Sequence, residues 1–280
     1  AMHMGQGGGL SALLDSIPVA ADFTEHYLVN MARGDMGVVR ALTVRTRARP
    51  VLGELARAFP RSLGLLLVAQ ALALVIGLPL GVVAALRRRT RFSGLLVFIS
   101  VLGVSTPSYF AAMLLIWFNV WLYRVSGVDF IPIYGFGWDA HLILPALVLA
   151  ARPAANVMRL GYNALTEILD ADFVRTAHAK GLRPRIVLIR HVLRNASVPL
   201  LTTMAVSLRF SLAILPIVEY IFSWGGIGQM LLTAIDLHDT TTVLGMVLPL
   251  AILFVLINIA LEILYLFLDP RLRIKEVSAT

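Results

Sequence analysis

Cysteine is absent from the 280-residue sequence, which excludes disulfide bonds and thiolate metal sites. Charged residues are also scarce, at 14% of the chain, whereas a soluble domain carries roughly a quarter. Hydrophobic residues make up 59%, so lipid is the expected solvent for most of the chain. The net charge of +8 would suggest nucleic acid in a soluble protein, but the arginines lie between hydrophobic runs, where membrane topology explains them. We therefore expect no nucleic-acid partner.

Long apolar runs predict the fold class. A spanning helix needs about 20 largely apolar residues, and five stretches have this length. They are residues 62–86, 92–123, 141–162, 196–222 and 240–268. The prediction is an all-α, polytopic helical membrane protein with about five transmembrane helices. The second run is longer than a straight crossing needs, and Pro107 is the expected bend because proline removes a backbone donor.

Basic residues in the short loops predict the orientation, because such loops usually face the cytoplasm. Arginine-rich segments follow the first, third and fifth runs, and the intervening loops carry little positive charge. We therefore expect a multi-pass protein of a bacterial-type inner membrane with a cytoplasmic C-terminus. The arginines before Ser62 break this rule, since five spans place them outside. Either a further helix normally precedes them and sets the topology, or this arm lies along the membrane surface.

The predicted organisation divides the chain into four parts. Residues 1–9 indicate a tag or flexible lead, and residues 10–61 an extracytoplasmic arm. Residues 62–270 form the transmembrane domain, which contains a cytoplasmic loop at 172–195. Residues 271–280 form a cytoplasmic tail.

The 172–195 loop is too long for a simple turn and predicts two short helices. Asp172 provides an acidic helix start, Gly181 is a plausible C-cap, and Pro184 suits the first turn of a second helix. A basic loop that only anchors the topology is the alternative. Topology needs basic residues, however, and requires neither a glycine hinge nor paired amphipathic helices.

Linked motifs in this loop and beyond carry a family resemblance. Residues 175–182 are RTAHAKGL, and residues 190–195 are RHVLRN. Together they resemble the cytoplasmic coupling motif of permease subunits in binding-protein-dependent ABC importers, in the dipeptide, oligopeptide and nickel branch. Residues 218–228, VEYIFSWGGIG, resemble the outward loop of the first of the two permeases in such systems. Gly225 stands where the family commonly has proline.

The resemblance implies the type I ABC importer permease architecture, which usually has six transmembrane helices. It implies a subunit that forms half of the translocation pathway for peptides. Nickel chelates, glutathione or oligosaccharides are alternative cargoes, and an autonomous secondary transporter or channel is the alternative of another class. The implied partners are a second homologous permease subunit, two cytoplasmic ATPase subunits, an extracytoplasmic solute-binding protein and membrane lipid.

The chain itself is not expected to be an enzyme. It contains no Gly-x-x-x-x-Gly-Lys-Ser/Thr phosphate loop, the motif that cradles nucleotide phosphates in many ATPases. ATP and Mg²⁺ are therefore expected in the partner ATPases, and this chain should hold no cofactor and no metal ion.

Candidate site residues fall into two groups. The resemblance assigns ATPase coupling to Arg175, Thr176, Ala177, Lys180, Gly181, Leu182, Arg190 and His191. The charged residues inside spans, Arg209, Arg152 and Glu219, are candidates for the translocation pathway. A central arginine costs roughly 2.5 to 3.5 kcal/mol on insertion scales, so Arg209 should face protein or water. It could meet a peptide carboxylate or carbonyl, or pair with an acid on the partner permease.

Overall fold

The structure, a computed structural model, describes residues 49–128 and 131–268, together with Pro18, Asp22, Val29, Asn30, Arg33, Val38 and Val39. Strand β1 (Val38–Val39) pairs antiparallel with β2 (Arg49–Pro50). The predicted lead 1–9, most of the predicted arm and the tail 271–280 lie outside the described residues.

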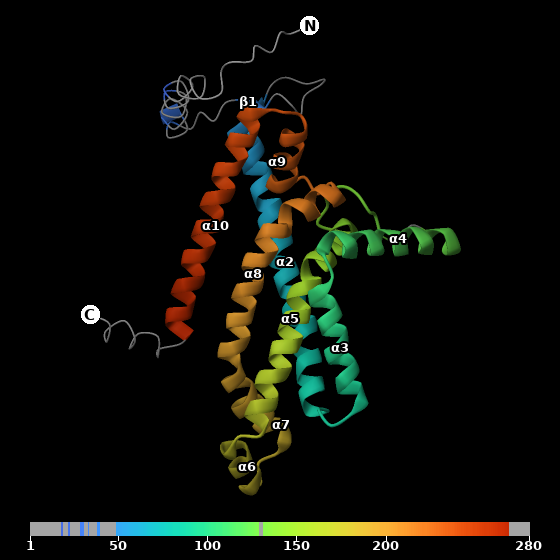
Figure 1. Cartoon of the computed structure of the whole chain (residues 1–280), viewed down its shortest axis with the longest axis vertical. Helices are drawn as coiled ribbons and strands as arrows, with labels where there is room; N and C mark the ends of the chain where they lie inside the picture. The colour runs from blue at the N-terminus through green and yellow to red at the C-terminus, as the bar shows by residue number, and fades with distance from the viewer. Residues whose placement is uncertain are drawn as a thin grey trace, which may run out of the picture.

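Helices account for most of the remaining described chain (Figure 1). The long ones are α2 (Val51–Leu86), α3 (Arg91–Ser105), α4 (Ser108–Ser126), α5 (Ile143–Leu169), α8 (Arg194–Phe222) and α10 (Thr240–Leu268). The short ones are η1 (Ala140–Leu142), α6 (Asp172–Ala179), α7 (Pro184–Ile186), the π-helical η2 (Val187–Leu193) and α9 (Ile227–Asp236). Within the described residues, 5 helices are long and apolar enough to cross a membrane. The predicted fold class is confirmed.

The first long helix begins earlier than the apolar run suggested. Helix α2 starts at Val51, whereas the prediction was Ser62. The extra turns contain Glu54 and Arg57, whose side chains form an ion pair of 3.2 Å one turn apart. Hydropathy detects the apolar part of a helix and misses a charged extension that continues it.

The run 92–123 is divided into two helices, so the prediction of one bent span was wrong. Helix α3 ends at Ser105, Thr106 is extended (φ −76°, ψ 123°), and Pro107 precedes α4. A residue before proline is sterically disfavoured from the helical region, which explains the break. Helix α4 runs crosswise to the bundle (Figure 1), and α4, not the shorter α3, has the length and composition of a spanning helix.

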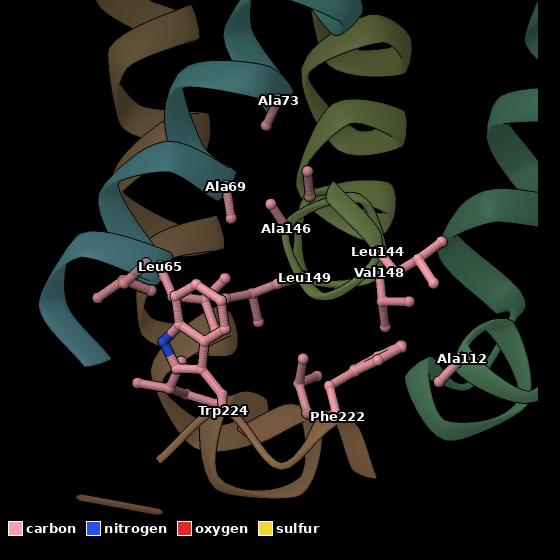
Figure 2. Close-up of a cluster of buried hydrophobic side chains, with 14 of the residues drawn as sticks. Leu65, Ala69, Ala73, Ala112, Leu144, Ala146, Val148, Leu149, Phe222 and Trp224 are labelled. Atoms are coloured by element: carbon pink, nitrogen blue, oxygen red, sulfur yellow. The ribbon is translucent and has the colours of Figure 1, made fainter. Parts of the chain in front are cut away.

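The centre of the bundle is the close contact of α2 with α5. A Cβ atom added at Gly77 would lie 2.5 Å from the carbonyl oxygen of Ala154, so only glycine permits this approach. Figure 2 shows the apolar cluster beside this contact. It includes Leu65, Ala69 and Ala73 of α2, Leu144, Val148 and Leu149 of α5, and Phe222 and Trp224 at the end of α8.

Candidate functional site

The segment predicted to couple to the ATPases, residues 172–195, is called the coupling segment below. It projects from one end of the bundle (Figure 1). Helix α6 begins at Asp172, as predicted, and its C-cap is Lys180, one residue before the predicted Gly181. Gly181 follows with φ +74°, and the Leu182 N–H donates to the Ala177 carbonyl at 3.3 Å. This is the left-handed helix ending in which glycine is favoured. Gly181 therefore reverses the chain immediately after α6.

The second half of the coupling segment is not a separate helix, which corrects the prediction of two short helices. Pro184 opens α7, as expected, but α7 continues through the π-helical η2 into α8. Residues 184–222 thus form one continuous helical stretch of 39 residues. Residues 184–193 of the coupling segment are therefore joined to α8 without an intervening loop.

Helix α6 is anchored on one side and exposed on the other. Val174 and Ala177 are buried in an apolar cluster with Val187, Ala85 of α2 and Leu165 of α5. The exposed coupling residues are Arg175, Thr176, Lys180, Gly181, Leu182 and Arg190, and His191 is half-buried. Burial gives Ala177 the role of an anchor, so its position does not support direct contact with a partner.

An ion pair joins the coupling end to the turn between α2 and α3. Arg88 on that turn lies 2.6 Å from Asp170, which caps the end of α5. Both side chains are partly exposed, so the pair contributes little to stability. It does place the α2–α3 turn beside the start of the coupling segment.

The candidate pathway arginines lie inside the bundle and are half-buried. The Arg152 guanidinium lies 4.2 Å from the ring centroid of Phe210, which neighbours Arg209 on α8. The Nε atom of Arg209 is buried without a hydrogen-bond partner, as is that of Arg159. In the part of the chain that the structure describes, no ion pair forms at Arg152 or Arg209. The structure therefore places Arg152 against the Phe210 ring and leaves the buried Nε atom of Arg209 without a hydrogen-bond partner among the described residues.

Glu219 has a different environment. Its side chain is fully buried, and its Oε2 accepts hydrogen bonds from the backbone N–H groups of Gly228 at 2.8 Å and Gln229 at 3.2 Å. These N–H groups belong to the first turn of α9, which has no partners of its own for them. Glu219 therefore caps α9, and its burial does not support the predicted pathway role.

The cap belongs to a larger cluster that sequence reasoning missed. We call Arg61, Ser62, Glu219, Trp224 and Gln229 the α9 lock. Ser62 Oγ accepts from the Ile227 N–H at 2.9 Å, and the Trp224 indole N–H donates to the Arg61 carbonyl at 3.0 Å. Trp224 is fully buried. The VEYIFSWGGIG motif is the sequence feature that could have indicated this cluster. The α2 residues that contact it, however, lie some 160 residues earlier in the chain.

Gly225 shows where this chain departs from the family pattern. Its φ is +73°, a conformation that proline cannot adopt. The Arg61 guanidinium donates to the Gly225 carbonyl at 3.4 Å and lies 4.2 Å from the ring centroid of Phe136. Glycine at this position therefore permits a turn that brings the loop against α2.

Near the same end of the bundle, Asp139 opens the short helix η1. Its carboxylate accepts the backbone N–H of His141 at 3.0 Å and lies 2.7 Å from His141 Nδ1. These hydrogen bonds lower the pKa of Asp139 below its usual 3.8. Among the described residues, no group of three or more His, Cys, Asp or Glu side chains could hold a metal ion.

Comparison with known proteins defines the class of this chain. Residues 77–274 match the family described as "Binding-protein-dependent transport system inner membrane component". The chain belongs to this family and is a transmembrane permease subunit of an ABC importer, a multi-pass component of the inner membrane. The predicted class is confirmed, and it makes the chain a transport component rather than an enzyme.

Two permeases and one solved structure are similar to this chain. The glutathione transport system permease protein GsiC of Escherichia coli is 34% identical over 252 residues, which cover 89% of this chain and 78% of GsiC. GsiC of Pectobacterium atrosepticum is 33% identical over 250 residues, with the same two coverages. An inward-facing structure of the MetNI methionine ABC transporter covers 80% of this chain and 100% of its own, with a TM-score of 0.62. Its identity is 22%, so it shows the fold alone.

Proposed function

We propose that this chain forms half of a pathway for short peptides, with the tripeptide glutathione, one of the alternative cargoes above, as the favoured candidate. The GsiC relatives support this cargo, since their name specifies glutathione and they match 89% of the chain. The proposed complex contains a second homologous permease, two cytoplasmic ATPases that bind ATP and Mg²⁺, and an extracytoplasmic solute-binding protein. Nickel chelates and oligosaccharides are the alternatives that a cargo measurement must separate.

The construction of the coupling segment is the observation that carries the ATPase-coupling part of this proposal. Its exposed face offers Arg175, Lys180 and Leu182 to a partner, while Val174 and Ala177 fix α6 to the bundle. A surface that is exposed on one side and rigidly anchored on the other can transmit force. A protein that needed basic residues only for topology would not require this anchoring.

The continuous helix from Pro184 to Phe222 connects the docking end to the opposite end of the bundle. Closure of the ATPases around ATP would shift the coupling segment as a rigid body, and α8 would carry that shift towards the α9 lock. In this arrangement the coupling segment and the C-terminus are cytoplasmic, and α9 faces outward.

Arg209 and Arg152 are the proposed pathway residues of this chain. A half-buried guanidinium without an ion-pair partner is costly in a membrane unless it meets water or an anion. The carboxylate of a peptide is such an anion, and bidentate guanidinium–carboxylate contacts are among the strong hydrogen bonds. The second permease would enclose these arginines from the other side.

Gly181 offers a sharp test of coupling, because the space around it is open and only its φ of +74° is demanding. Gly181→Val places a β-branched residue in the left-handed region, at a strain of about 1–2 kcal/mol. If the undocked turn relaxes to relieve this strain, docking has to restore it and should weaken by about 5- to 30-fold. Gly181→Asn is the matched control, since asparagine tolerates this conformation. Both variants should insert normally.

The measurement is peptide uptake by proteoliposomes containing the whole complex, with the ATPases quantified on the same purified sample. Gly181→Val should lower uptake and ATPase retention together, and Gly181→Asn should keep most of both. Full uptake by Gly181→Val would contradict the coupling role. Mass spectrometry of solute bound to the native complex identifies the cargo, and a metal chelate or sugar in place of a peptide would refute the peptide assignment.

A further inference from the structure

Two arginines on the α2–α3 turn, residues 87–90, and a third at the first position of α3 have no role in the proposal above. Arg87, Arg89 and Arg91 are exposed. Within the described part of the chain none of the three has a carboxylate partner, whereas Arg88 between them pairs with Asp170. Three uncompensated cations therefore stand at the point where an apolar helix ends.

The side chains next to this turn are apolar and exposed. Leu86 ends α2 at 53% exposure, and Phe92 and Leu95 at the start of α3 are 44% and 53% exposed. Helix α3 packs against α2 and α5 and lies at the edge of the bundle (Figure 1). An apolar surface thus adjoins a cationic turn, which matches the boundary between the acyl chains and headgroups of a lipid leaflet.

We propose that the α2–α3 turn binds the headgroup of an anionic phospholipid, with the acyl chains along the exposed faces of α2 and α3. Guanidinium groups suit this ligand because they can donate two parallel hydrogen bonds to a phosphate. The Arg87 guanidinium lies 5.7 Å from the ring centroid of Phe92, which keeps one of these cations close to the apolar boundary.

This site would do more than set topology. Topology depends on the number of basic residues in a loop, while a headgroup site depends on which arginines lie beside exposed apolar surface. The Arg88–Asp170 ion pair places the turn beside the start of α6. A bound anionic lipid would therefore lie next to the coupling segment and could stabilise its position relative to α2.

The test compares lipid binding by native mass spectrometry of the complex in detergent. The probes are phosphatidylglycerol and phosphatidylcholine with identical acyl chains. The variant carries Arg87→Gln, Arg89→Gln and Arg91→Gln. Each basic residue near an anionic headgroup contributes about a factor of five, so phosphatidylglycerol should bind roughly a hundredfold more weakly. Phosphatidylcholine binding should change little.

A second triple variant makes the same change in net charge outside the coupling segment. It carries Arg33→Gln, Arg57→Gln and Arg124→Gln, all at exposed positions. This control should keep the wild-type preference for phosphatidylglycerol. Equal losses in the two variants, or equal binding of both lipids by the wild-type complex, would overturn the proposal. Loss of the ATPases from the first variant with lipid binding intact would also overturn it, because the turn would then be a protein interface.

Discussion

Removal of the Glu219 carboxyl group should release α9 from the bundle while leaving the spanning helices folded. Glu219 is fully buried and its Oε2 accepts from two backbone N–H groups at the start of α9, at 2.8 and 3.2 Å. Glu219→Ala removes the acceptor of both donors, of which the Gly228 N–H is buried and the Gln229 N–H is partly buried. Ser62→Ala is the smaller companion change, since it removes only the acceptor of the Ile227 N–H.

The size of the effect follows from the contacts. An unsatisfied buried donor costs about 1–3 kcal/mol, and the Gln229 donor is only partly buried. We therefore expect Glu219→Ala to destabilise α9 locally by about 2–4 kcal/mol, and Ser62→Ala by about 1–2 kcal/mol. Since 1.4 kcal/mol is about tenfold in an equilibrium constant, amide exchange in α9 should accelerate by roughly 30- to 1000-fold in Glu219→Ala.

Hydrogen exchange followed by mass spectrometry measures this directly on peptides from residues 223–236. Tyr220→Phe is the matched control, because it removes an exposed hydrogen bond of 2.8 Å to Asp236 from the same region. That bond competes with water, so exchange in the control should stay close to wild type. Peptides from α5 report whether the bundle remains intact. Unchanged exchange of the α9 amides in Glu219→Ala would refute the capping argument, and equal acceleration in α5 would show global rather than local unfolding.

Two further predictions concern the helix contact and the pathway. Gly77→Ala should lower the thermal stability of the purified chain, since its Cβ would lie 2.5 Å from a backbone oxygen, whereas Gly94→Ala has open space and should be neutral. A lower melting temperature for Gly94→Ala than for Gly77→Ala would contradict the packing argument. Arg209→Gln should reduce peptide uptake by about 10- to 100-fold, because a hydrogen bond to a charged group contributes roughly 1.5–3 kcal/mol. ATPase binding by Arg209→Gln should be unchanged. Arg159→Gln is its control, and equal uptake by the two variants would remove Arg209 from the pathway.

The coupling segment shows how local signals lead to a correct prediction. An acidic residue, good helix formers, a glycine and a proline within 13 residues predicted the start of α6, the turn at Gly181 and the start of α7. Each of these depends on backbone preferences within a few residues. The continuity of η2 with α8 was not predictable in this way, since the π-helical segment has no comparable local signature.

The division at Pro107 marks a limit of hydropathy. An apolar run of 92–123 is equally compatible with one bent helix and with two helices, because lipid-facing composition is the same in both. The extended conformation of Thr106 decides between them, and the crosswise course of α4 follows from it (Figure 1). Hydropathy therefore predicts which residues enter lipid and leaves their direction open.

The sequence by itself determined that this protein is a helical membrane protein of the permease class. Without water in the bilayer core every backbone polar group must be paired within the chain, so long apolar runs leave helices as the available structure, and linked motifs identify the family. Only the tertiary structure decided that Glu219 caps α9, that Trp224 is buried and that Gly77 admits the α5 backbone. These outcomes depend on which groups meet across long sequence separations, as in the hydrogen bond from Arg61 to Gly225. Such long-range contacts are determined by the packing of the whole bundle, and no local sequence pattern encodes them.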